Sequence, residues 1–203
     1  MKLATILYGT VTGNAAQCAK ELGTTLKSSG VPNRVLDMRE FAAEELPGLG
    51  LVLVVTSTTG NGDPPYNAEG LFHHLHGDRP SLDGLRFAVM AMGSRRFVNF
   101  AQCGKDFDAI LAELGAERVV ERVDCDGYYE DSLDDFQNRL FEYFAANPEQ
   151  FPDFKVPEPE PEPAPAPAPT PQPSAAEPPP KPRSLLGRVK ARIKRTIRRE
   201  RRS

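Results

Sequence analysis

The sequence predicts a doubly wound α/β domain, in which helices cover both faces of a parallel β-sheet. Between residues 1 and about 147, short apolar segments alternate five times with segments of helical character. Several of the apolar segments are continuous, and such strands suit a parallel sheet that is buried on both faces. Regular alternation of strands and helices is typical of this architecture. We therefore expect an α/β three-layer sandwich around a five-stranded parallel sheet.

Five apolar segments are expected to form the strands. They are Leu3–Tyr8, Arg34–Asp37, Leu51–Thr56, Phe87–Met92 and Val119–Val123. In sheets of this kind, ligands bind beyond the carboxyl ends of the strands. The loops that follow these segments are therefore the places to search for function.

Five helices are expected between and after the strands. They are Asn14–Ser28, Arg39–Glu45, Asn67–His76, Phe100–Leu114 and Glu130–Ala145. Gly30 and Gly115 stand just past two of them, where glycine commonly ends a helix in the left-handed conformation.

The composition changes sharply after residue 147. Of the 20 prolines in the chain, 15 lie between Pro148 and Pro182, mixed with glutamate and alanine. Such a composition cannot bury a core. We expect three regions: a folded domain over residues 1–147, a Pro-rich disordered linker over residues 148–183, and a basic amphipathic tail over residues 184–203.

Charge is distributed unevenly along the chain. Residues 184–203 carry nine Arg or Lys and one Glu, a net +8, so the remaining residues carry −11 within a total of −3. Apolar residues recur at every fourth position of the tail, at Leu185, Val189, Ile193 and Ile197. This spacing predicts a basic amphipathic helix. We rank an anionic membrane surface as its first partner and the acidic body of the chain as its second. A solvated, disordered tail without a partner remains the alternative. Nucleic acid is not expected as a partner.

Other features bear on location and on metal chemistry. No apolar run has membrane-spanning length and no signal-peptide layout precedes the domain, so we expect a cytoplasmic protein, with peripheral placement on the inner face of the membrane as an added hypothesis. The three cysteines lack metal-ligand spacing, and His73, His74 and His76 do not converge on one helix face. We expect no metal site.

The segment from Thr10 to Ala15 follows the first expected strand and opens the first expected helix. Backbone N–H groups at a helix start and the positive end of the helix dipole favour a bound anion. Thr10, Thr12 and Asn14 add side chains that can donate to phosphate oxygens. Because threonine and asparagine also cap helices, the segment by itself fits both a phosphate site and a plain cap.

Three further loops follow expected strands. Residues 57–65 combine two glycines with two prolines, which bends the backbone so that it can approach a flat ligand. Residues 93–100 place an aromatic side chain on the same rim, and residues 124–129 end in two tyrosines. Together with the phosphate loop, they indicate a planar ring system that bears one phosphate.

Four stretches carry a family resemblance: YGTVTGNAAQCAKEL, TSTTGNGDPP, AVMAMG and CGKDFDAILAELGAERVVERVDCD. Through them, residues 1–147 resemble the flavodoxin-like FMN domain of the diflavin reductase family, and most of all that of the sulfite reductase flavoproteins. The resemblance implies strand order 2-1-3-4-5 and non-covalently bound FMN. It covers neither linker nor tail, and no G-x-G-x-x-G fingerprint of a reductase module occurs, so we expect a standalone domain.

The resemblance also implies roles for individual residues. The phosphate of FMN would be held by Thr10, Val11, Thr12, Gly13, Asn14 and Ala15. One side of the isoalloxazine ring would be lined by Ser57, Thr58, Thr59, Gly60, Asn61 and Gly62. The other side would be lined by Gly93, Phe97, Asn99 and Phe100, with Asp124 as an acid near the ring.

Two positions depart from the family's pattern. Thr59 stands where microsomal relatives carry a second stacking tyrosine, so one face of the ring would be less covered. Residues 94–96, Ser-Arg-Arg, replace a segment that usually begins with aspartate. Two cations there would favour a reduced, anionic flavin and alter the choice of partner.

The leading hypothesis is an FMN-binding electron-transfer protein: a one-electron shuttle with an NADPH-linked reductase as donor and a haem or iron–sulfur protein as acceptor. FMN supplies the redox chemistry and the protein supplies binding, orientation and electrostatics, so no catalytic residue is required. The alternatives are an FMN-dependent NAD(P)H:acceptor oxidoreductase of the quinone-reducing kind and a flavin-free docking module. An electron carrier of the oxidoreductase class is favoured over a self-sufficient enzyme.

Overall fold

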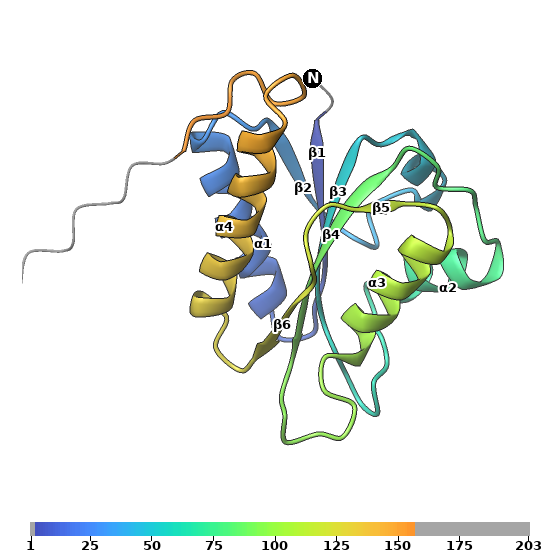
Figure 1. Ribbon diagram of the computed structural model, residues 1–203. Coiled ribbons are helices and arrows are strands. Elements are labelled where there is room, and N and C mark those ends of the chain that lie inside the picture. Colours follow the sequence, from blue (N-terminus) through green and yellow to red (C-terminus); the bar gives the residue numbers. More distant parts are fainter. Residues whose placement is uncertain (1–2, 157–203) are drawn as a thin grey trace, which may run out of the picture. The chain divides into compact units, whose positions relative to one another are not determined.

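The described part of the chain forms one parallel β-sheet with helices on both faces (Figure 1). The computed structural model describes residues 3–156, and the predictions for the tail and for most of the linker lie outside the described residues. The strands are β1 (Ala4–Gly9), β2 (Asn33–Asp37), β3 (Leu51–Ser57), β4 (Arg86–Gly93), β5 (Glu117–Arg118) and β6 (Val123–Asp126). Their order is β2-β1-β3-β4-β5, and β6 also pairs with β4. The expected fold class and strand order are confirmed.

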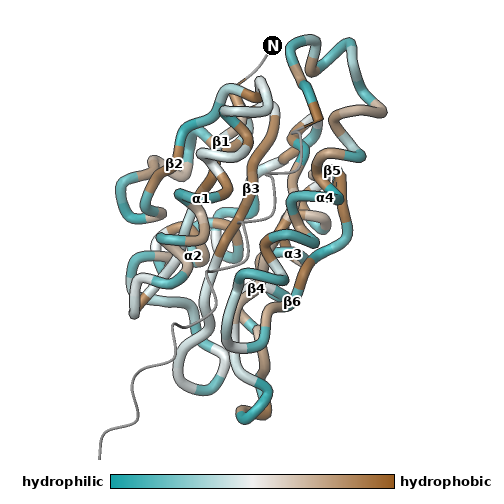
Figure 2. The backbone as a smooth tube through the Cα atoms, turned by 90° about the vertical axis from the view of Figure 1, so that its left-hand side faces the viewer, coloured by the Kyte–Doolittle hydropathy of each residue, from teal (hydrophilic) through white to brown (hydrophobic). Residues whose placement is uncertain are grey.

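Strands β1, β3 and β4 form the centre of the sheet. Ala4 pairs with Leu51 and Leu51 with Arg86, so the three strands start level. Six of the seven residues of β3 are buried, which explains why this segment is continuously apolar. Figure 2 shows β3 in brown between helices that carry much teal. Because the strands are parallel, their carboxyl ends meet at one edge, which we call the carboxyl edge.

The helices divide between the two faces of the sheet (Figure 1). They are α1 (Asn14–Ser28), the 3-10 helix η1 (Ala43–Gly48), α2 (Glu69–Gly77), α3 (Gln102–Glu113) and α4 (Glu130–Ala146). The core beneath α1 and α4 contains Ile6 and Phe136, whereas the core beneath α2 and α3 contains Leu7 and Phe107. Neighbouring residues of one strand thus serve opposite cores, as the alternation of side chains along a strand requires.

The prediction of a helix over Arg39–Glu45 is wrong. Oδ1 of Asp37 accepts the N–H of Arg39 at 2.9 Å, and the chain turns here before η1 begins at Ala43. An aspartate that bonds the backbone two residues further on favours a turn over a helix. Pro47 lies inside η1 and disfavours an α-helix, because proline removes an N–H donor.

The strand expected over Val119–Val123 is wrong over most of its length, because residues 119–122 lie between two shorter strands, β5 and β6. The two-residue β5 pairs with the start of β4, and β6 pairs with its end. Between them, Arg118 and Arg122 both reach the carboxylate of Asp108, at 2.7 and 2.9 Å. The residues between the two strands, 119–122, belong to no strand, so the backbone leaves the regular sheet where Arg122 pairs with Asp108.

The folded part of the chain continues beyond Asn147. Phe151 is only 4% exposed and belongs to the core beneath α1 and α4, with Phe154 packed against it. The N–H of Lys155 donates to the carbonyl of Ser29 at 2.9 Å. The boundary that composition places at residue 147 therefore falls too early, because two phenylalanines follow the first proline of the linker. Within residues 3–156, no helix has the length and apolarity that crossing a membrane demands.

Candidate functional site

The loop between β1 and α1 leads into a helix start that no side chain caps. Gly13 adopts the left-handed conformation at φ 94°, and α1 begins at Asn14 without a side-chain hydrogen bond to its first N–H groups. The first turn of α1 also contains no acidic residue. Open N–H groups at the positive end of a 15-residue helix favour an anion. The hydrogen bonds of this helix therefore favour the phosphate interpretation of Thr10–Ala15 over a plain cap.

Thr10 shapes this loop through two hydrogen bonds of its own. Its Oγ1 accepts the N–H of Gly13 at 3.0 Å, and its N–H donates to Oδ1 of Asn67 at 2.8 Å. Thr10 is thus engaged within the protein, whereas Val11 and Thr12 are exposed. The groups open to an anion are the backbone and side chains that follow Thr10.

A closed turn follows β3. The N–H of Thr59 donates to the carbonyl of Asp63, and the N–H of Asp63 donates to the carbonyl of Thr59, each at 2.9 Å. Gly60 and Gly62 have φ angles of +49° and +116°, and the second value favours glycine strongly. The hydroxyl of Thr59 also donates to the carbonyl of Asp63 at 3.1 Å. Thr59, which stands where microsomal relatives carry a tyrosine, therefore closes the turn.

The loops after β3 and β4 interlock. The side-chain amide of Asn99 donates to the carbonyl of Asn61, and the N–H of Cys103 donates to Oγ1 of Thr58 at 3.2 Å. A Cβ atom on Gly62 would lie 3.2 Å from Cβ of both Asn99 and Gln102. The structure thus brings together the two loops that the sequence assigned to opposite sides of one ring.

Phe97 and Phe100 have different surroundings, although the sequence grouped them. Phe97 is 65% exposed. The ring of Phe100 is half-buried, with the guanidinium of Arg95 at 5.4 Å and Nζ of Lys105 at 5.2 Å from its centre. Gly93 lies directly beneath this loop, since a Cβ atom there would lie 2.6 Å from the nitrogen of Ala101. Phe97 is therefore the aromatic side chain open to a ligand, and Phe100 anchors the loop.

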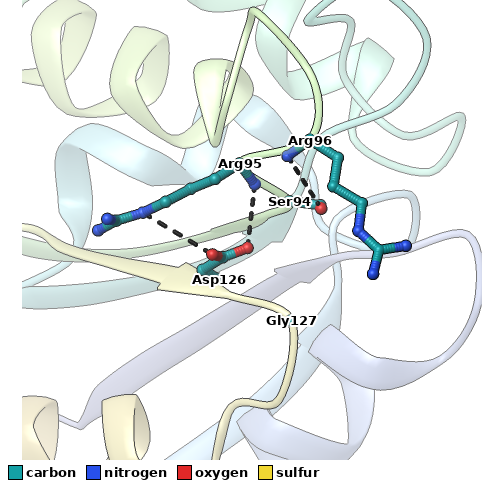
Figure 3. Close-up of a pocket in the computed structure, with 5 residues that line it drawn as sticks. All are labelled: Ser94, Arg95, Arg96, Asp126 and Gly127. Carbon is teal, nitrogen blue, oxygen red and sulfur yellow. Dashed lines mark hydrogen bonds and ion pairs between the residues drawn. The ribbon is translucent and has the colours of Figure 1, made fainter.

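The loop after β4 and the end of β6 enclose a hollow of about 470 Å³. Figure 3 shows its lining residues, with the side chains of Arg95 and Arg96 extending in opposite directions. The N–H of Arg95 donates to Oδ1 of Asp126 at 3.0 Å, and its Nε lies 3.8 Å from Oδ2 of the same carboxylate. Among the described residues, Arg96 has no such carboxylate partner. Only one of the two expected cations thus lacks a counter-charge.

Asp124 belongs to a network of charges on the α3 side of β6. Its carboxylate accepts from Nε of Arg122 at 2.6 Å, and Arg122 in turn reaches the buried Asp108. Hydrogen bonding to Asp124 raises the pKa of Arg122 above its ordinary value. The carboxylate of Asp124 is therefore balanced by a permanent guanidinium charge, and its expected role near a ring stays a prediction.

Exposed apolar side chains gather in the loops of the carboxyl edge. Within residues 3–156, five of the seven large hydrophobic side chains that are exposed lie there: Val11, Tyr66, Phe97, Val98 and Tyr128. A concentration of exposed apolar groups marks a binding surface. Sequence reasoning did not single out Tyr66 or Val98, although apolar residues in loops after strands were the available signal.

Comparison with known proteins places this geometry in a family. The family model for flavodoxin matches residues 6–140. The sulfite reductase [NADPH] flavoprotein alpha-component of Bacillus subtilis (strain 168) is 44% identical over 131 residues, which are 64% of this chain and 22% of that protein. That of Neisseria meningitidis serogroup B (strain ATCC BAA-335 / MC58) is 41% identical over 123 residues, 60% of this chain and 20% of the relative. The chain spans about a fifth of the length of these relatives.

Solved structures agree with the sequence comparison. A flavodoxin of Streptococcus pneumonia TIGR4 superposes with a TM-score of 0.64 at 25% identity, over 71% of this chain and 99% of the other. The C101A mutant of flavodoxin from Pseudomonas aeruginosa superposes with a TM-score of 0.59 at 28% identity, over 68% of this chain and 97% of the other. Family match, strand order and loops at the carboxyl edge all agree: the chain belongs to the flavodoxin family of FMN-binding electron-transfer proteins.

Proposed function

We propose that FMN lies across the loops of the carboxyl edge and that the chain carries electrons, one at a time, between a reductase and an acceptor protein. The observation that carries this proposal is the arrangement of the edge itself. An uncapped helix start lies after β1, and two interlocked loops that expose apolar side chains lie after β3 and β4. This arrangement fits a ligand with an anionic end and a flat apolar end.

The phosphate would be held at the start of α1. The backbone N–H groups of Val11, Thr12, Asn14 and Ala15 supply donors, and the side chains of Thr12 and Asn14 add two more. No lysine or arginine is needed at this point, because the helix dipole and the N–H groups stabilise the charge. Thr10 and Gly13 would contribute through the shape of the loop, and the hydrogen bond between them supports this role.

The ring would be held by the loops after β3 and β4. The proposed lining on one side is the turn from Ser57 to Gly62, and on the other it is the segment from Gly93 to Phe100. Phe97 offers its exposed ring for stacking, which is worth about 0.5–1.5 kcal/mol for an aromatic pair beyond buried area. Bound FMN supplies the one-electron chemistry, and the chain supplies orientation, exclusion of water and electrostatic tuning.

The redox partners that we propose are an NADPH-linked reductase as donor and a haem or iron–sulfur protein as acceptor. Support comes from the relatives, which are NADPH sulfite reductase flavoproteins by name. Residues outside the tail carry a net charge of −11, because the chain totals −3 and the tail carries +8. A strongly charged surface speeds association with partners of opposite charge.

Absorbance spectroscopy of the purified full-length protein tests FMN binding. We expect a flavin spectrum, either as purified or after incubation with FMN, and two separate one-electron steps in an electrochemical titration. NADPH alone is expected to reduce the flavin slowly, and NADPH with a reductase rapidly. A protein that stays colourless with added FMN contradicts the proposal, and rapid reduction by NADPH alone favours the oxidoreductase alternative.

We further propose that the protein is cytoplasmic and that residues 184–203 hold it at an anionic membrane surface. The support is the sequence pattern of an apolar stripe on a basic helix. Each basic residue near such a surface contributes about 1 kcal/mol. Flotation with phosphatidylserine-containing vesicles should carry the full chain upward and leave a 1–183 truncation behind. Equal flotation of the two proteins contradicts the tether.

A further inference from the structure

Asn67 lies in the loop before α2, outside every group of residues that the sequence assigned to a ligand, yet it is only 6% exposed. A buried amide is retained where its hydrogen bonds are satisfied, because each unmade bond costs free energy. Its contacts therefore show what this residue holds in place.

The amide of Asn67 joins three segments of the chain at the carboxyl edge. Its Oδ1 accepts the N–H of Thr10 at 2.8 Å. Its Nδ2 donates to Oδ1 of Asp37 at 3.0 Å and to the carbonyl of Tyr8 at 3.5 Å. The oxygen faces a donor and the nitrogen faces two acceptors, so the chemistry of the partners determines the orientation of the amide.

These bonds determine the shape of the phosphate loop at its first residue. Asn67 holds the backbone of Thr10, and Oγ1 of Thr10 holds the N–H of Gly13. The backbone between them, Val11 and Thr12, is exposed. The loop is thus anchored at both ends while its middle stays open, which is what preorganisation for a ligand requires.

We propose that Asn67 is a positioning residue, which holds the Thr10–Gly13 loop in the conformation that receives the phosphate of FMN. The inference rests on the proposed function and deepens it. Both the oxygen and the nitrogen of the Asn67 side-chain amide are hydrogen-bonded within the protein. Asn67 therefore acts through Thr10, and it helps to discriminate between flavins without contacting the flavin itself. Its contribution is therefore specific for the phosphorylated flavin, because riboflavin has no phosphate to receive.

The test compares the affinities of FMN and riboflavin for the full-length protein and its Asn67→Ala variant, by quenching of flavin fluorescence. We expect the dissociation constant of FMN to rise about tenfold, and that of riboflavin to change less than twofold. The matched control is Asn33→Ala, at the opposite edge of the sheet, where Nδ2 of Asn33 donates to the carbonyls of Gly23 and Val31 at 2.9 and 3.0 Å. That variant should change the affinities of both flavins by the same factor.

Amide hydrogen exchange in flavin-free protein gives a second measurement, and its comparison within the wild type needs no variant to fold. The N–H of Thr10 should exchange much more slowly than that of Thr12, and the difference should vanish in Asn67→Ala. Equal exchange of the two amides in the wild type overturns the proposal, and so does an equal loss of FMN and riboflavin affinity in Asn67→Ala. A wild-type protein that binds neither flavin overturns the proposed function, while the exchange data still decide whether Asn67 holds the loop.

Discussion

The side-chain amide of Asn99 donates a hydrogen bond to the backbone carbonyl of Asn61 and so ties the loop after β4 to the turn after β3. The two residues are 38 positions apart in the sequence. Because both loops lie at the carboxyl edge, this bond, together with that from Cys103 to Thr58, holds their relative position at the proposed ring site.

Removal of this bond should weaken flavin binding. Asn99→Ala is expected to raise the dissociation constant of FMN about fivefold, since a hydrogen bond of this kind contributes about 1 kcal/mol. Titration of flavin fluorescence measures the effect. Asn147→Ala is the matched control, because Nδ2 of Asn147 also donates to a carbonyl, that of Tyr143, but at the far end of the 17-residue α4. Unchanged FMN affinity in Asn99→Ala would show that the two loops keep their position without this bond.

Two glycines in helices should respond to alanine with opposite signs. A Cβ atom on Gly104 of α3 would lie 2.7 Å from Cα of Ala91, so α3 packs directly on the backbone of β4. We expect Gly104→Ala to lower the free energy of unfolding by about 1–3 kcal/mol through overpacking. Gly70 of α2 has no atom within 4 Å of such a Cβ, and Gly70→Ala should raise it by about 0.5–1 kcal/mol. Urea denaturation measures both, and a stabilising Gly104→Ala would contradict the packing.

The buried carboxylate of Asp108 should matter more for stability than an exposed one. Asp108 is 6% exposed and accepts from Arg118 and Arg122. Asp108→Ala should lower the free energy of unfolding by about 3 kcal/mol, because the partly buried guanidinium of Arg118 loses its counter-charge and that of Arg122 keeps only Asp124. Asp135→Ala breaks an exposed pair with Arg139 on α4 and should cost about 0.5 kcal/mol or less. Equal costs in thermal or urea denaturation would contradict this difference.

Stability should fall in alkaline solution because of buried thiols. Burial raises the pKa of Cys18 and of Cys103 from about 9 to about 12. Below pH 9 both thiols are neutral in the folded and unfolded states, whereas above pH 9 only the unfolded state releases their protons. The free energy of unfolding should therefore decrease as the pH rises from about 9 toward 12.

Urea denaturation at pH 8, 9 and 10 measures this decrease. The double variant Cys18→Ala, Cys103→Ala is the control and should show a flatter dependence on pH, whatever its absolute stability. The range ends at pH 10 because the pKa of Tyr129 is itself raised from 10 to about 12 by burial and by its hydrogen bond to Glu21. Parallel pH dependences in the two proteins would contradict the role of the thiols.

Local pattern predicted most helices and strands, and it was wrong where side chains from distant elements decide the conformation of the backbone. The prediction for α1, Asn14–Ser28, agrees with the structure at both ends. Arg122 belongs to the strand expected over Val119–Val123, but in the structure it lies between β5 and β6 and pairs with Asp108 of α3. The helix expected over Arg39–Glu45 failed for a local reason, the turn that Asp37 forms with the N–H of Arg39.

The sequence by itself determined the fold class, the strand order through family resemblance, and the loops that carry the site, because continuous apolar strands and glycine-rich strand ends are local features. Only the tertiary structure decided how those loops are held. Asn67 bonds Thr10 across 57 positions, and the ring of Phe100 has two cations, Arg95 and Lys105, close to it, while Phe97 stays exposed. The physical reason is that these contacts depend on which strand ends meet at the carboxyl edge. Residues that are far apart in the sequence come close there, and local sequence pattern does not show which of them will be in contact.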